Sequence, residues 1–470
     1  MSAPEEKALR RQAREAKELA RLEKEKAKPK PKLYFWYLII CLCLIYIVDE
    51  VATSLPNAMA AEINAEFFVR GLGFSVAEGA SRISLMEMLA NICLVIGFFY
   101  KALADRFGRK PFLIFNTIGM AGALMLCFWA PNLVVYLFGF FLLRFFVTPD
   151  EQIVYIMETA PEKKRATVYS AVKGVAELGL LLIPLGRKAF MGNDETLWRM
   201  VFLIPAILGL VVAFAVLFLA RETDFFLDSR IAYLKLAPAE KEKIAREKKD
   251  RKKKQGGFWN AIRYSFSDKQ LRWVFLVTMF FTLSRAITSH YTEILSIANY
   301  STDDISNALL IFPLTCAAII FVYGFFSDRF GRKLTSIALL AISLVTLTLL
   351  VVGALFGWSA YLLGAFIGLF LGSYWSNSDT LILLCGESSP TNLRASVLSA
   401  QTAFYGIGMV ASQGIASIIL GQIPDNMLGL FCILMAGPFF LLSIGFLLFK
   451  VKETKGLALE SPLVEENRQE

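Results

Sequence analysis

The sequence has little charge and almost no histidine. Of its 470 residues, 19% are charged and 1 is a histidine. It contains no HExxH metal motif, no Walker-type nucleotide loop and no recognisable grouping of a nucleophile with a base. We therefore expect no enzymatic activity and no metal or other cofactor.

Cysteines are also few, and their spacing carries no signal. All of them fall inside apolar segments, which argues against both a disulfide framework and a metal site. We expect them to act as small apolar side chains. They are Cys41, Cys43, Cys93, Cys127, Cys316, Cys385 and Cys432.

Apolar residues, in contrast, are abundant. They make up 56% of the chain, and many stretches run for about 20 residues with few or no charges, long enough to cross a hydrocarbon layer of roughly 30 Å. Continuous runs of this length predict helices rather than the alternating strands of a membrane barrel. The sequence thus predicts an all-α protein embedded in a lipid bilayer.

We count twelve spanning segments in two groups of six. The first group is predicted at 34–57, 83–103, 110–130, 133–157, 166–190 and 199–220, and the second at 272–296, 306–327, 334–356, 359–385, 395–420 and 427–450. The predicted organisation is therefore an N-terminal tail (1–33), a six-helix bundle (34–220), a central loop (221–271), a second six-helix bundle (272–450) and a C-terminal tail (451–470).

One set of loops lacks lysine and arginine. Segments 299–306 (NYSTDDIS) and 421–426 (GQIPDN) have none, whereas the N-terminal tail, segment 161–166 (PEKKRA) and the central loop are rich in them. Because positive loops stay inside, both termini are predicted to be cytoplasmic, in a multi-pass protein of the cytoplasmic membrane. The net charge of +9 comes largely from these loops and does not indicate nucleic-acid binding.

The two long charged segments have no strong pattern of their own. The mixed acidic and basic residues of the N-terminal tail favour a solvated helix or coil. The central loop is interpreted as a solvated, partly helical linker, with contact to anionic lipid headgroups as the alternative.

A charged hexamer, DRFGRK, occurs at 105–110 and again at 328–333. A second pair of segments, 150–171 and 379–400, shares Asp, Glu, Pro, Arg and a Ser-Ala pair at the same spacing. Two ordered repeats with offsets of 223 and 229 residues predict that the two bundles are structural copies, as in many transporters. Glycine in each hexamer allows a tight turn between two helices.

Both hexamers, KALADRFGRKP and GFFSDRFGRKL, resemble the loop signature of the major facilitator superfamily. The pairs Glu158/Arg165 and Glu387/Arg394, together with KETKGLALE at 452–460 and RETDFF at 221–226, are similar to its sugar-porter and metabolite–proton symporter branch. The resemblance implies an inter-half salt-bridge network that gates the cytoplasmic side. The implied gate residues are Asp105, Arg106, Gly108, Arg109, Glu158, Arg165, Glu222, Asp328, Arg329, Gly331, Arg332, Glu387, Arg394 and Glu453.

Several charges fall inside predicted spans, where each costs about 2.5–3.5 kcal/mol and needs a reason. The resemblance implies that helices 1, 4, 7 and 10, which carry most of these charges, line a central cavity. It also implies an acid on helix 1 and an arginine on helix 4 as a proton-coupling pair, which makes Asp49, Glu50 and Arg144 the candidates. Asp49 could instead contact substrate or pair permanently with an arginine.

Asp150 and Asp379 occupy equivalent positions in the repeat, either in a buried polar network or beside a substrate. The candidate substrate-binding residues are Asp150, Glu151, Tyr155, Arg285, Trp375, Asn377, Asp379, Gln401 and Tyr405. Lys173 and Glu177 stand four residues apart and are expected to pair. His290 is interpreted as a satisfied interfacial histidine, with a proton relay as the alternative.

The predicted function is secondary active transport of a small polar organic solute, by alternating access and coupled to proton import, in a monomer. Helix 7 lacks the Gln-rich patch that sugar porters carry. Arg285 there favours a carboxylate or phosphate, whereas the excess of acids suits an amine or zwitterion, so the substrate stays open. An uncoupled facilitator and a transporter-like nutrient sensor are the rival functions.

Overall fold

A computed structural model describes most of the chain. The described residues are 3–29, 33–101, 108–147, 155, 156, 158, 159, 165–192, 194–238, 240, 241, 243, 258–390 and 393–455. Within them, seven helices are long and apolar enough to cross a membrane, and Leu133–Val147 is a shorter apolar helix.

The N-terminal half consists of helices that follow the predicted apolar runs. They are α2 (Tyr34–Ala58), α4 (Val76–Lys101), α6 (Arg109–Trp129), α7 (Leu133–Val147), α9 (Arg165–Gly179) with α10 (Leu182–Phe190), and η3 (Glu195–Phe202) with α11 (Leu203–Leu219). Two short elements, α3 (Ala60–Ile63) and η1 (Asn64–Arg70), connect α2 to α4. Helix α4 begins seven residues before its predicted start.

The C-terminal half has the same helix order. Its elements are α15 (Lys269–Thr282), η4 (Arg285–Ser289) and α16 (Tyr291–Ile297), then α17 (Thr302–Phe330), α18 (Arg332–Leu355), α19 (Ala360–Ser388), α20 (Arg394–Leu420), η5 (Asp425–Met427) and α21 (Leu428–Phe449).

Two predicted spans are broken rather than continuous. The span predicted at 166–190 divides into α9 and α10, just before Pro184, which lacks an N–H and clashes with a preceding carbonyl. The span predicted at 272–296 divides at η4, where the Ser284 hydroxyl donates to the Phe281 carbonyl (2.6 Å) and the Ala286 N–H donates to Ser412 Oγ (2.9 Å). Side chains thus satisfy backbone groups that an unbroken helix would have paired.

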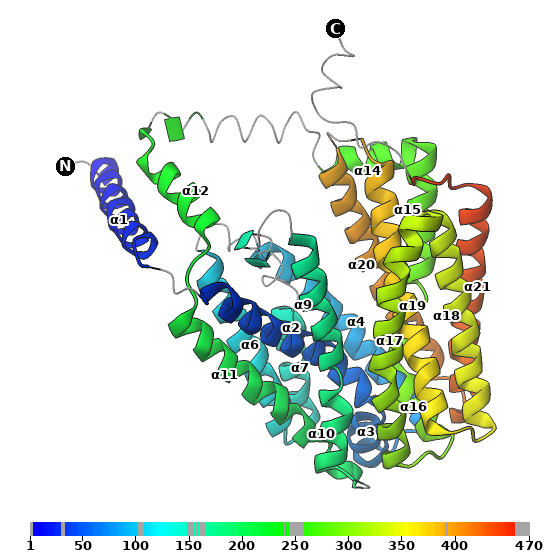
Figure 1. The fold of residues 1–470 in the computed structure, drawn as a ribbon. Helices are drawn as coiled ribbons and strands as arrows, with labels where there is room; N and C mark the ends of the chain where they lie inside the picture. Colours follow the sequence, from blue (N-terminus) through cyan, green and yellow to red (C-terminus); the bar gives the residue numbers. More distant parts are fainter. Residues whose placement is uncertain are drawn as a thin grey trace.

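The two halves meet at one end of the molecule and diverge toward the other (Figure 1). We call the first the far end, where α3, α10 and α16 lie. The second is the motif end, where Gly108, Gly331 and residues 450–455 lie. Helix α4 packs along α20, and both α9 and α10 contact α17, so the second helix of each half contacts the fifth span of the other.

At the motif end, the N-terminal segment forms a helix, α1 (Ala3–Lys26), that packs against α12 (Asp224–Lys235). Leu22 is buried with Leu227, Ile231 and Leu234. Four ion pairs flank this apolar contact: Glu15–Lys241, Glu18–Arg230, Glu23–Lys235 and Lys26–Asp228. The expected helix is therefore present and mostly exposed, and its short apolar face has a partner from the central loop.

Candidate functional site

At the motif end, a compact polar cluster joins three segments of the N-terminal half. Gly108 precedes α6 with φ +111°, and the backbone N–H groups of Arg109 and Lys110 donate to the Glu222 carboxylate at 3.0 and 3.2 Å. The Arg109 guanidinium lies 3.0 Å from Glu158, which also accepts a hydrogen bond from the Thr223 hydroxyl (2.5 Å). Helix N-termini favour anions, so Glu222 caps α6.

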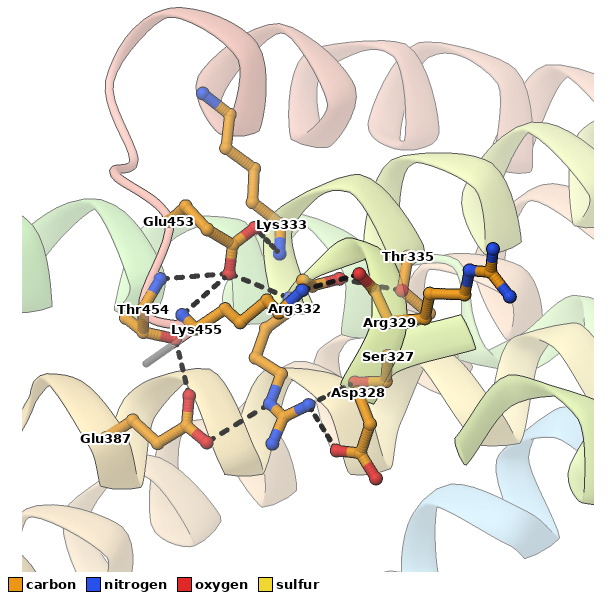
Figure 2. Close-up of polar contacts among 11 residues, drawn as sticks. Ser327, Asp328, Arg329, Arg332, Lys333, Thr335, Glu387, Glu453, Thr454 and Lys455 are labelled. Atoms are coloured by element: carbon orange, nitrogen blue, oxygen red, sulfur yellow. Dashed lines mark hydrogen bonds and ion pairs between the residues drawn. The ribbon is translucent and has the colours of Figure 1, made fainter. Parts of the chain in front are cut away.

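The C-terminal half repeats this cluster. Figure 2 shows Glu453 accepting from the backbone of Arg332 (2.8 Å) and Lys333 (3.1 Å) at the start of α18. The Arg332 side chain reaches Glu387 at 3.1 Å, and Thr454 donates to the same carboxylate at 2.6 Å. The segments RET (221–223) and KET (452–454) therefore play the same part in the two halves. Each supplies a glutamate that caps a helix and a threonine that donates to a second glutamate.

Glycine is required in both turns for two reasons. Gly108 and Gly331 have φ of +111° and +100°, a region that other residues rarely adopt. In addition, a Cβ at Gly108 would lie 2.4 Å from Glu222 Oε2, and one at Gly331 would lie 2.2 Å from Glu453 Oε2. The capping carboxylates therefore occupy space that only glycine leaves open.

The two capping glutamates differ in burial. Glu222 is 6% exposed, because the N-terminal segment covers it, whereas Glu453 is exposed. The Glu222 N–H donates to Glu25 (3.3 Å), and Arg221 donates to the Lys28 carbonyl (2.7 Å). Burial raises the pKa of Glu222 to about 7, and the backbone hydrogen bonds from Thr223, Lys110 and Arg109 only partly offset it.

The other predicted gate residues are placed as follows. Asp328 pairs with Arg332 (2.7 Å). Arg329 is exposed and stacks over Phe330, and Arg394 donates to the Gly386 carbonyl (2.9 Å). Asp105 and Arg106, and the side chain of Arg165, lie outside the described residues.

Arg109 and Arg332 each form an ion pair within their own half. Arg109 and Glu158 belong to the N-terminal half, and Arg332 and Glu387 to the C-terminal half. The resemblance implied a network between the halves at this end. That network is not formed by these pairs, because the two clusters lie on halves that diverge at the motif end (Figure 1).

At the far end, by contrast, polar groups link the two halves. Arg187 on α10 is fully buried; it pairs with Glu62 (2.5 Å) and donates through Nε to Ser306 on α17 (3.1 Å). Neither residue of this ion pair was singled out from the sequence. The signal was available, because Arg187 falls inside a predicted span, where a charge needs a partner.

A second link at the far end involves the single histidine. His290 bonds the Glu293 carboxylate through Nδ1 and lies 3.0 Å from Ser84 Oγ through Nε2. The other Glu293 oxygen accepts from Asn64 at 2.7 Å. His290 and Glu293 belong to the C-terminal half, whereas Ser84 and Asn64 belong to the N-terminal half. The prediction of a satisfied histidine is confirmed, and one of its two partners, Ser84, lies in the other half.

Three more hydrogen bonds cross between the halves at this end. They join Ser81 Oγ to the Ser417 carbonyl (2.5 Å), the Ala77 N–H to Asp425 Oδ1 (2.7 Å), and Lys188 Nζ to Asn307 Oδ1. At the far end, the two halves are therefore joined directly by hydrogen bonds.

The proton-coupling candidates lie within the N-terminal half. Asp49 is buried and Glu50 is half-buried, both on α2. Arg144 on α7 is buried and forms an ion pair with Glu87 on α4 at 2.6 Å. Sequence reasoning left Glu87 without a role, because nothing in the sequence shows that α4 and α7 pack together.

One ion pair crosses between the halves near the motif end. Lys173 on α9 lies 3.8 Å from Asp379 on α19, and Tyr323 on α17 donates to the same carboxylate (3.3 Å). Lys173 was expected to pair with Glu177 of its own helix. The structure gives it a partner in the opposite half, because α9 packs against α17, the neighbour of α19.

The remaining substrate-binding candidates do not form one group. Arg285 is half-buried on η4 and bonds Thr288. Trp375 and Tyr405 are half-buried, on α19 and α20. Asn377 is fully buried, and its Oδ1 accepts from Ser336 on α18 (2.5 Å). Gln401 is also buried and donates to Thr278 (3.1 Å).

The prediction for Tyr155 was wrong. Its hydroxyl donates to the Arg221 carbonyl after α11, and its ring is buried in the apolar core of the N-terminal half. It therefore stabilises the motif end of that half instead of facing a solute. Asp150 and Glu151 lie outside the described residues.

Comparison with known proteins decides the family. A family model described as "Sugar (and other) transporter" matches residues 55–462. The chain belongs to this family. No curated protein matches the transporter in sequence.

Several solved structures have a fold similar to that of the transporter. A D-xylose–proton symporter is 16% identical, with a TM-score of 0.66, 90% of this chain covered and 99% of that one. The xylose transporter XylE from E. coli, in a partially occluded inward-open conformation, is 17% identical, with a TM-score of 0.63 and coverages of 89% and 100%. A bacterial homologue of the human lysosomal transporter Spinster, inward-facing and unoccupied, is 15% identical, with a TM-score of 0.59 and coverages of 90% and 99%.

At these identities the likeness establishes fold and not substrate. The transporter is an all-α membrane protein with the major facilitator fold of two pseudo-symmetric helical bundles, and it falls in the sugar-porter branch. The repeated motif-end clusters are the local form of that pseudo-symmetry.

Proposed function

We propose that this transporter imports a small polar organic solute together with protons, by alternating access. The solute is a sugar or a similar metabolite, with an organic acid as the main alternative. The protein lies in the cytoplasmic membrane as a monomer. Its motif end faces the cytoplasm, and both termini are inside the cell. Positive charge in the loops of the motif end favours this orientation.

One observation carries the transport cycle: the halves are bonded to each other at the far end and diverge at the motif end. This asymmetry is what a rocking-bundle transporter has when its path is open to one side. The motif-end clusters are complete within each half, so each can move as a rigid unit. In the opposite state, they would meet and the far-end bonds would break.

Proton coupling is supported by ionisable residues inside the helices. A charge in a membrane span is costly and usually marks a transport path or a proton site. Asp49 and Glu50 on α2, with Arg144 on α7, are the candidates from the sequence, and Arg144 is held by Glu87. Likeness of fold to a D-xylose–proton symporter supports a coupled mechanism of the same kind.

The solute class rests on the family and on the side chains of the C-terminal half. Sugar-type solutes need hydroxyl-binding groups and aromatic faces, which Trp375 and Tyr405 offer. Arg285 supplies a cation near Tyr374 on the facing helix, which would suit a solute with a carboxylate. We therefore expect sugars and sugar acids to bind more tightly than amines.

The test is uptake in proteoliposomes. Purified protein is first screened against sugars, sugar acids, amines and amino acids by thermal shift, since a binder stabilises the folded state by mass action. Uptake of the best binder is then measured with and without an imposed inward proton gradient. Accumulation above equilibrium that disappears with a protonophore supports the proposal.

The rival functions predict different results in the same assay. An uncoupled facilitator equilibrates the solute, and the protonophore does not change its rate. A nutrient sensor binds the solute with no flux in either condition. Either result would overturn the proposal of proton-coupled import.

A further inference from the structure

The ion pair between Lys173 and Asp379 connects the two bundles directly. Its 3.8 Å separation is at the long limit for an ion pair, and both side chains are partly exposed, at 29% and 42%. Lys173 lies two turns from the start of α9 and Asp379 about two turns from the end of α19, so both are on the motif-end side of the membrane. Here the halves must change separation most during alternating access.

Glu177 lies one turn further along α9 and has a different environment. It is only 4% exposed, and its Oε2 is buried without a hydrogen-bond partner. It lies within electrostatic reach of both Lys173 and Asp379. A buried carboxylate with an unsatisfied oxygen is costly when ionised and much less so when it holds a proton.

The titratable groups around Glu177 come from four helices. On its own helix the neighbour is Lys173, four residues earlier, and on α19 it is Asp379. Cys316, buried on α17, lies within reach of Glu177, Lys173 and also Glu50 of α2. Tyr323 on α17 bonds Asp379. One lysine is thus shared among acids that belong to both halves.

We propose that Glu177 binds the co-transported proton and that Lys173 controls its release by exchanging Asp379 for Glu177 as its partner. This inference rests on the proposed function and names the residues that couple proton and solute. It differs from the candidates given by the sequence, which are Asp49, Glu50 and Arg144.

The exchange follows from the geometry of one helix. Lys173 and Glu177 are four residues apart on α9, a spacing at which side chains meet, so they move together when the halves rock. While Lys173 pairs with Asp379, Glu177 keeps its proton. When the motif end opens further, Asp379 recedes, Lys173 turns to Glu177, and the proton leaves to water on that side.

The cycle then returns to its starting state and needs no reactant other than the proton. When the halves approach again at the motif end, Lys173 returns to Asp379 and Glu177 is left without a cation. The far end is then open, so Glu177 takes a proton from water on the far side. One proton crosses per cycle, from the far side to the motif side.

The test follows buried carboxyl groups by infrared spectroscopy on purified protein while the pH is raised, with no solute present. In a Glu222→Gln background, which removes the other buried carboxyl group with a raised pKa, we expect one protonated-carboxyl band to disappear over a single pH step and to be missing once Glu177→Gln is added. The Glu50→Gln variant, with a half-buried acid on the neighbouring helix, should keep it. Loss of that band in Asp49→Asn with its retention in Glu177→Gln would overturn the proposal.

Two further variants keep Glu177 in place and move the step in opposite directions. Lys173→Met removes the competing cation and should shift the step upward by about one pH unit or more, whereas Asp379→Asn frees Lys173 for Glu177 and should shift it downward. A merely structural role for these residues predicts no such opposition, so shifts of one sign would overturn the proposal.

The infrared experiment and the uptake assay of the proposed function can fail independently of each other. Transport that ignores the proton gradient in the wild-type protein removes coupling altogether, and with it any proton carrier. Coupled wild-type transport combined with an infrared step that is independent of Glu177 removes only the present inference.

Discussion

Glu222 and Glu453 occupy the same position in the two halves of the molecule. Each follows the last helix of its half and accepts two consecutive backbone N–H groups at the start of the third helix. Each is followed by a threonine that donates to the glutamate held by the motif arginine. The end of each half is thereby fastened to its middle, which makes each half a unit that can move as one body.

The Gly331→Ala variant tests this fastening. The new Cβ would require a left-handed backbone at a cost of about 1–2 kcal/mol and would displace the Glu453 carboxylate from the α18 N-terminus. We expect a lower thermal unfolding midpoint in detergent. Gly324→Ala is the matched control, because nothing lies near its Cβ and alanine suits a helix. Equal midpoints for the two variants would contradict the role of Glu453.

Glu222 should make stability depend on pH. Its pKa is raised by burial from 4.5 to about 7, so the folded state favours the neutral form. Stability is then greatest below pH 4.5 and is lost as the pH rises to about 7. We expect the unfolding midpoint of Glu222→Gln to gain on the wild type between pH 5 and pH 8.

The control for this titration is Glu453→Gln. Glu453 makes the equivalent backbone contacts in the other half but is exposed, so this variant removes the same cap without a buried carboxylate. Parallel pH profiles for wild type and Glu222→Gln would show that burial of this carboxylate does not affect folding.

Breaking the buried far-end ion pair should be costly. Arg187→Met leaves Glu62 charged and buried without its cation, which typically costs 3–5 kcal/mol, whereas the double variant Arg187→Met/Glu62→Met should recover much of that loss. The free energy of unfolding of the single and the double variant gives the loss and its recovery. Arg70→Ala provides the comparison, because its pair with Glu195 is exposed and worth less than about 1 kcal/mol. Equal losses at Arg187 and Arg70 would contradict burial as the reason.

The packing of α1 on α12 can be tested with one charge. Leu22→Asp places a carboxylate against Leu227 and Leu234, and we expect it to release α1 and expose that helix to limited proteolysis. Ala20→Asp, on the exposed side of α1, should leave the cleavage pattern unchanged. Protection of α1 in the Leu22 variant would show that the ion pairs alone hold it.

Local signals in the sequence predicted a large part of this structure. Apolar runs predicted the spans, and the repeated hexamer predicted the two glycine turns. These features depend on residues close in sequence or on an internal copy. Arginine at 109 and 332 reaches a carboxylate in each case through the same turn geometry.

The contacts that the sequence did not reveal depend on packing between distant segments. Arg144 pairs with Glu87 across two helices, and Lys173 has a partner, Asp379, in the opposite half. A span with a charge predicts that a partner exists, but the choice of partner is set by which helices touch. For the same reason the sequence could not show that the N-terminal tail would bury Glu222.

The most direct test of the account is a pair of spin-label distances measured in one sample series, in a background without the native cysteines. One pair, at Lys188 and Asn307, reports the far end, where these side chains bond across the halves. The other, at the exposed Phe225 and Asp328, reports the motif end. The account predicts that conditions which lengthen the first distance shorten the second. Two distances that lengthen together, or a far end that never opens, would contradict it.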